Sequence, residues 1–136
     1  MKLKLLSVAS VIELHDRVLN PGELEGLAGS KSLEGALSRI DFRISYAVIQ
    51  DEFDLAATYA VAIAQGHVFN DANKRTAHAA MELCLYMHDV HIGFTTEEVG
   101  DLIIKVAQGL VDEGELGTWL RTKKIKALEE ELRKKG

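Results

Sequence analysis

The ten residues from Leu55 to Ala64 contain no charged side chain, and Thr58 and Tyr59 are their only polar members. A helix on a protein surface carries its apolar residues on one face, so a segment that is apolar nearly all round is expected in the interior. Alanine and leucine also favour the helical conformation. The segment therefore predicts a central buried helix, which the remaining elements must surround.

A second segment of the same kind runs from Thr76 to Met87, and shorter apolar patterns at helical spacing lie on both sides of the pair. Ser7 and Ser32 are placed to cap two earlier helices, because a serine hydroxyl can accept a hydrogen bond from a free N–H of the first turn. After the pair, Thr95-Thr96-Glu97-Glu98 marks another N-terminus with acids in its first turn. A last helix is expected from about Leu116 to the end.

Two segments are ambiguous. Residues 2 to 6 alternate lysine and leucine in part, which is a short strand pattern. Arg43-Ile44-Ser45-Tyr46 also alternates like a strand, whereas Tyr46-Ala47-Val48-Ile49 fits a helix. With one proline in 136 residues and few β-branched runs, the chain is predicted to be a single all-α domain over residues 1–136, with at most a short N-terminal strand or flap.

The composition disfavours several classes of protein. The formal net charge of −5 argues against nucleic acid as a partner. A single cysteine, Cys84, excludes a disulfide framework within the chain and a thiolate zinc site. No apolar run reaches the roughly 18 residues of a membrane-spanning helix, and the first residues lack the apolar core and cleavage site of a secretory signal. A reducing cytoplasm is the expected location.

A densely polar stretch, residues 66–76, joins the two apolar segments. Asn70-Asp71-Ala72-Asn73 is rich in N-capping residues, so the second central helix should begin within it. A helix N-terminus presents unpaired N–H groups and the positive end of the dipole, which together attract anions. Lys74 and Arg75 oppose that dipole, and a bound phosphate would offset the repulsion. Arg75 can hold phosphate oxygens as a fork, and Lys74 as a point charge.

The acid and the imidazole of this loop complete a possible reaction site. Asp71 offers a hard oxygen ligand beside the phosphate binders, which suits Mg²⁺, an ion usually held by one or two carboxylates together with phosphate oxygens. His67 follows the first central helix and fits a general base for an incoming hydroxyl. Phe69 is expected to anchor the loop to the core. Positioning, charge neutralisation and a base are most of what phosphoryl transfer requires.

The residues alone leave two other interpretations open. The loop could be an ordinary helix start, with its acid and amide as caps, its two cations solvated and its imidazole satisfied by the core. Alternatively, His67, Asp71 and His78 could hold zinc, since hydrolases use such sets. The zinc interpretation leaves Asn73 and the two cations without a role.

The segment His67-Val68-Phe69-Asn70-Asp71-Ala72-Asn73-Lys74-Arg75 resembles the Fic motif, His-x-Phe-x-Asp/Glu-Ala/Gly-Asn-x-Arg. Its Ala-Asn-Lys-Arg ending is similar to that of the Doc branch, the death-on-curing toxins of toxin–antitoxin pairs. Leu14-His15-Asp16 in the first helix, Ala57-Thr58-Tyr59 before the motif and the short chain also resemble Doc proteins. The likeness therefore covers most of the chain.

The resemblance implies a helical Fic fold and a nucleotide-dependent modification of a protein hydroxyl. By position in the motif, His67 would be the catalytic base and Asp71 the Mg²⁺ ligand. ATP or another nucleoside triphosphate would be the co-substrate.

Asn73 and Arg75 match the family's phosphate ligands. Two other positions differ from those of most Fic enzymes, which transfer AMP. Lys74 stands where the AMP-transferring enzymes have glycine and would fill part of the anion hole. His78 stands where they have a second arginine, and it is a candidate nucleotide contact or a packing residue. In Doc toxins such a site is associated with reversed nucleotide binding, so that the γ-phosphate is transferred. The resemblance therefore implies a kinase-like toxin.

The same resemblance implies two protein partners. The family target is a threonine of elongation factor Tu, whose phosphorylation stops translation, and the toxin is neutralised by a small Phd-like antitoxin with an acidic, amphipathic tail. AMP transfer to a protein hydroxyl, or a degenerate scaffold that acts only by binding, are the alternatives. The family also places a target-docking flap near residues 43–46, where a plain turn fits equally well.

Overall fold

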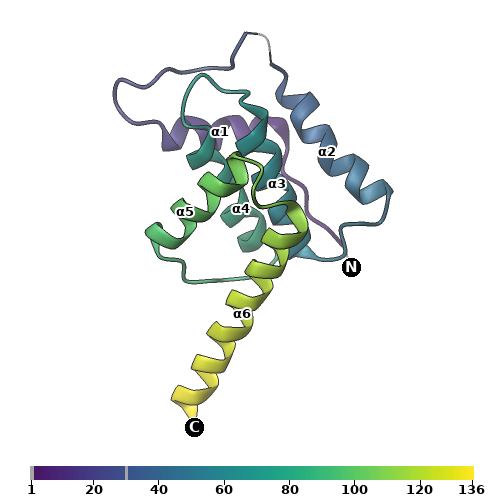
Figure 1. Cartoon of the computed structure of the whole chain (residues 1–136), viewed down its shortest axis with the longest axis vertical. Coiled ribbons are helices and arrows are strands. Elements are labelled where there is room, and N and C mark those ends of the chain that lie inside the picture. The colour runs from purple at the N-terminus through teal and green to yellow at the C-terminus, as the bar shows by residue number, and fades with distance from the viewer. Residues whose placement is uncertain (1, 30) are drawn as a thin grey trace.

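The computed structural model describes residues 2–29 and 31–136, and these residues form six α-helices and no strand (Figure 1). The all-α prediction is confirmed. The helices are α1 (Val8–Val18), α2 (Leu33–Ser45), α3 (Glu52–Gly66), α4 (Asn73–Met87), α5 (Thr96–Ala107) and α6 (Glu113–Lys135). In this part of the chain, no helix is both long enough and apolar enough to cross a membrane.

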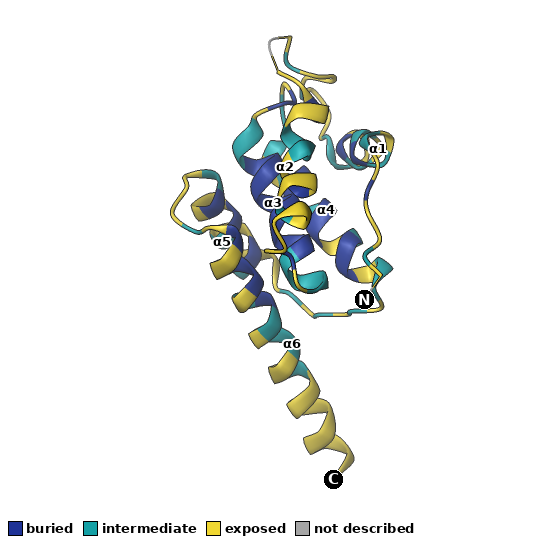
Figure 2. Cartoon of the chain, turned by 90° about the vertical axis from the view of Figure 1, so that its right-hand side faces the viewer, coloured by how far each residue is buried: buried dark blue, intermediate teal, exposed yellow. Residues whose placement is uncertain are grey.

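Helix α3 is the centre of the molecule. All ten residues from Leu55 to Ala64 are buried, and α3 packs against α2, α4, α5 and α6. Figure 2 shows this helix as a dark core within partly exposed neighbours. The many alanines of α3 allow the surrounding helices to approach it closely. Because α3 and α4 run side by side, the loop that joins them is held firmly at both ends, and this loop carries the polar motif.

The helix caps explain most of the helix boundaries. Ser7 accepts a hydrogen bond from the Ser10 N–H and Ser32 accepts one from the Gly35 N–H, as predicted. Thr95 forms a capping box with Glu98. The last helix begins at Glu113, three residues before the predicted start at Leu116.

That earlier start has a local cause. Asp112 and Glu115 form a second capping box, in which each side chain binds the other residue's backbone N–H. The box satisfies two of the N–H groups that a helix start leaves free. The helix therefore starts at this acidic pair, one turn before its first leucine.

Two strand interpretations are wrong. Residues 2–6 form no strand, because their N–H groups bind side chains: Lys4 donates to His88 Nε2 at 2.9 Å and Leu6 to the Tyr59 hydroxyl at 2.7 Å. Arg43 to Ser45 form the last turn of α2 rather than a flap or a turn. Once Ser32 has started that helix, the chain stays helical until Tyr46, and Ala47 then leaves it with φ 56°.

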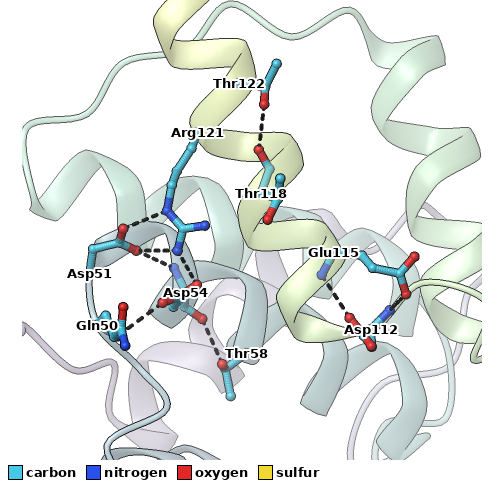
Figure 3. Close-up of polar contacts among 9 residues, drawn as sticks. All are labelled: Gln50, Asp51, Asp54, Thr58, Asp112, Glu115, Thr118, Arg121 and Thr122. Atoms are coloured by element: carbon cyan, nitrogen blue, oxygen red, sulfur yellow. Dashed lines mark hydrogen bonds and ion pairs between the residues drawn. The ribbon is translucent and has the colours of Figure 1, made fainter.

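The N-terminal half of α6 is fastened to the start of α3 by an ion-pair network (Figure 3). Arg121 donates to both oxygens of Asp51, at 2.7 and 3.1 Å, and to Asp54 as well. Burial raises the pKa of Asp51, but Arg121 and the Asp54 N–H lower it by more, so the pKa lies below the ordinary value. The helices touch at Gly117, where a Cβ atom would lie 2.7 Å from Asp54 Oδ1. Beyond Lys124, α6 projects from the body and is largely exposed (Figures 1 and 2).

Candidate functional site

The loop between α3 and α4 is held in a costly backbone conformation at both ends. His67 ends α3 with φ 50° and Ala72 precedes α4 with φ 61°, so both lie in the left-handed region. For a residue with a Cβ atom this conformation costs roughly 1–2 kcal/mol. Neither position is glycine, so contacts elsewhere must hold the loop in this shape.

Asn73 supplies one such contact from the first turn of α4. Its Oδ1 accepts a hydrogen bond from the Phe69 N–H at 3.1 Å, and its Nδ2 donates to the Phe69 carbonyl at 3.0 Å. The side chain predicted to bind phosphate is therefore committed to closing the loop. Ala72 has no side chain that could cap α4, so the first N–H groups of that helix are left for a ligand.

The loop also pairs with a segment that precedes α2. Ala28 N–H donates to the Val68 carbonyl at 2.7 Å and Asn70 N–H to the Gly26 carbonyl at 3.1 Å, with Leu27 opposite Phe69 in an antiparallel bridge. Gly26 has φ 84°, which favours glycine. The segment that pairs with the motif is therefore residues 26–28 rather than the predicted 43–46.

The guanidinium of Arg75 is already paired with another part of the protein. It donates to the carboxylate of Glu23 and to the carbonyl of Val18. The hydrogen bond from Arg75 lowers the pKa of Glu23, and the same bond raises the pKa of Arg75. Glu23 is thus a carboxylate at neutral pH, and the predicted phosphate fork lies against an internal anion.

Asp71 has the donor chemistry that Mg²⁺ requires. Its Oδ2 accepts the Leu24 N–H at 3.3 Å, which is a long hydrogen bond, and Asp71 lines the same pocket as the first residues of α4. A single carboxylate fits Mg²⁺ that is also bound by phosphate oxygens. The zinc alternative lacks support, because the described residues contain no group of three histidine, cysteine or acidic side chains that could hold a metal.

These groups meet in a pocket of about 300 Å³ at the junction of α3 and α4. Five of the six predicted site residues line it: His67, Asp71, Asn73, Lys74 and Arg75. Both His67 and Lys74 are exposed, and neither side chain has a hydrogen bond or ion pair to any described residue.

The sixth predicted residue, His78, is not brought into the pocket. Its Nε2 lies 2.7 Å from Glu82 Oε1, one turn further along α4. The structure also reveals three contributors that the motif did not indicate: Glu23, the backbone of Leu24, and the buried His15 of α1, whose Nε2 lies 2.8 Å from the Asp71 carbonyl oxygen. The sequence signals for them were the Doc-like segment Leu14-His15-Asp16, which marks His15 without indicating its partner, and an acid in a glycine-rich loop.

The geometry can be compared with known proteins. The model of the Fic/DOC family matches residues 5–85, which include the first three helices and the motif. The chain belongs to the Fic/DOC family. It is 37% identical over 117 residues to a protein of Escherichia phage P1 named protein kinase doc, an alignment that covers 85% of this chain and 92% of that relative. The Fic/DOC match confirms the resemblance, both at the motif and in the helices before it.

Proposed function

We propose that this chain is a Doc-type toxin that transfers the γ-phosphate of a nucleoside triphosphate to a threonine or serine hydroxyl of a protein. One observation carries the proposal: one pocket is lined by a carboxylate, by a helix N-terminus without a side-chain cap, and by an imidazole and an ammonium that bond to no residue the structure describes. The relative from phage P1 is named a protein kinase, which supports phosphate transfer over AMP transfer.

The residues of the pocket have separate roles in this reaction. His67 accepts the proton of the target hydroxyl while the hydroxyl oxygen forms a bond to the γ-phosphorus, and the bond from that phosphorus to the bridging oxygen breaks to release nucleoside diphosphate. Lys74 and the first N–H groups of α4 hold phosphate oxygens. Asp71 would hold Mg²⁺, which supplies charge neutralisation on the phosphates when it is bound.

We further propose elongation factor Tu as the target and an antitoxin with an acidic, amphipathic tail as the neutralising partner. Membership of the Fic/DOC family and the likeness to the phage P1 protein support both partners. A toxin that blocks translation in its own cell requires such a restraint.

The proposal is tested by incubating the purified chain and elongation factor Tu with Mg²⁺ and ATP labelled on either the α- or the γ-phosphate. We expect label on the target from γ-labelled ATP alone. Label from α-labelled ATP would establish AMP transfer instead. If neither label is transferred and the chain still arrests growth, the scaffold that acts only by binding becomes the better account.

The ion pair of Arg75 gives a second expectation. Glu23→Gln keeps an oxygen that can accept from Arg75 but removes the charge that competes with phosphate. We therefore expect Mg·ATP to bind more tightly, by roughly threefold, which is the scale of a partly exposed ion pair. Calorimetric titration with Mg·ATP measures the change.

Glu25→Gln is the matched control for this variant. Glu25 is exposed on the same loop, and no described residue forms an ion pair with it, so we expect its substitution to leave the affinity unchanged. Weaker binding by Glu23→Gln would show that Glu23 orients Arg75 for the phosphate rather than competing with it.

A further inference from the structure

His15 is a polar side chain in a place where packing alone would favour an apolar one. It lies on the inner face of α1 and is 1% exposed. Burying an imidazole costs free energy unless its nitrogens find partners. Its Nε2 and its ring both contact the motif loop. Its Nδ1 lies 3.5 Å from a carboxylate oxygen of Asp16, an exposed neighbour in the chain.

The two loop contacts hold different points of the motif. The His15 ring stacks on Phe69 with centroids 3.9 Å apart and planes 7° from parallel. Its Nε2 lies 2.8 Å from the carbonyl oxygen of Asp71. A carbonyl only accepts hydrogen bonds, so Nε2 carries the proton and donates.

The Asp71 carbonyl belongs to the peptide unit that leads into Ala72, the left-handed residue at the start of α4. Relieving the backbone strain at Ala72 would turn this peptide and would change the position of Asp71 relative to the first turn of the helix. Asn73 closes the loop through its two hydrogen bonds to the Phe69 backbone, and neither of these bonds involves the Asp71 carbonyl. His15 is therefore the side chain that fastens the peptide from outside the motif.

We propose that His15 is a positioning residue for nucleotide binding, which fixes the Asp71–Ala72 peptide and thereby the metal-binding carboxylate and the anion-binding turn of α4. The inference rests on the proposed function for its ligand, but the role of His15 in the shape of the loop does not depend on that function. His15 does not touch the reacting atoms in this account; it acts through Phe69 and Asp71.

Two variants of His15 separate the contribution of its hydrogen bond from that of its stacked ring. His15→Phe keeps a stacking ring and removes the donor, whereas His15→Gln keeps a donor and removes the ring. We expect the phenylalanine variant to bind Mg·ATP about tenfold more weakly, the lower end of what loss of an outer partner of a metal ligand costs. We expect the glutamine variant to keep an affinity for Mg·ATP within about threefold of the parent's, because glutamine retains a donor for the Asp71 carbonyl.

Two readouts are needed, and one of them requires no nucleotide. The first is the affinity for Mg·ATP, measured by calorimetry. The second is backbone hydrogen exchange of residues 71–75 in the nucleotide-free chain, which we expect to accelerate in His15→Phe and not in His15→Gln. A role in general stability alone would raise exchange throughout the core rather than in this turn.

His88→Phe is the matched control. His88 also bonds a backbone carbonyl, that of Cys84 at 2.7 Å, but at the far end of α4, so its replacement should leave both readouts unchanged. If His15→Phe does not fold, His15→Leu replaces it, since leucine and glutamine are similar in size and differ in the donor.

Wild-type affinity and unchanged exchange in the variant without the donor would overturn the inference. If the parent chain itself does not bind Mg·ATP, the proposed function fails, and the exchange of residues 71–75 still decides whether His15 fixes the loop.

Discussion

Replacing His67 with alanine is expected to abolish toxicity and to lower phosphate transfer by about 10²–10⁴-fold, the contribution of a positioned general base. His67 is exposed at the pocket mouth, and its side chain makes no hydrogen bond to any residue that the structure describes. Its removal therefore leaves the loop contacts in place. Transfer of label from γ-labelled ATP measures the rate, and calorimetry measures binding.

The expected pattern is a fall in kcat with little change in the affinity for Mg·ATP. An interaction made only in the transition state has this signature. His91→Ala, which removes an exposed histidine away from the pocket, should change neither quantity. If growth arrest survives His67→Ala unaltered, catalysis is not the cause of toxicity, and the chain acts by binding.

The helices could be predicted because their signals are local. The buried run of α3 and the serine caps of α1 and α2 each depend on residues within one or two turns. The same is true of the capping box of Asp112 and Glu115, which could have placed the start of α6 correctly. Alternation was misleading at residues 43–45, where the continuing helix of α2 decides the structure.

Most of the candidate site could be predicted because five of its residues lie within nine positions, on one helix–loop–helix junction. What could not be predicted are contacts between distant parts of the chain. Glu23 reaches Arg75 across 52 positions, and His15 reaches Asp71 across 56. Nothing in the local pattern at residue 23 or at residue 15 indicates its partner.

Contacts within the protein occupy two of the motif residues that were predicted to bind phosphate. Arg75 and Asn73 were expected to face a phosphate, but one is paired with Glu23 and the other closes the loop. Lys74 and the N–H groups of α4 are then the groups most available to an anion. Arg75 lines the same pocket but is bound to the carboxylate of Glu23.

Asp71→Asn is expected to remove most of the Mg²⁺ dependence of nucleotide binding. Asparagine has the same shape and keeps an oxygen that can accept the Leu24 N–H, so the loop should keep its conformation. The change removes one unit of negative charge from direct contact with a divalent ion. Even at a partly solvated site this attraction is worth several kcal/mol before desolvation is deducted, so we expect the affinity for Mg·ATP to fall on the order of a hundredfold.

The measurement compares ATP binding with and without Mg²⁺ in the parent chain and in the variant. In the parent chain Mg²⁺ should strengthen binding strongly, and in Asp71→Asn the two curves should nearly coincide. Asp101→Asn, which removes an equal charge from an exposed position of α5, should keep the parent's Mg²⁺ dependence. A variant at Asp71 that keeps this dependence would show that the ion is held by the phosphates alone. Asp71 would then serve the loop through its bond to Leu24, and the metal role assigned to it from the motif would be wrong.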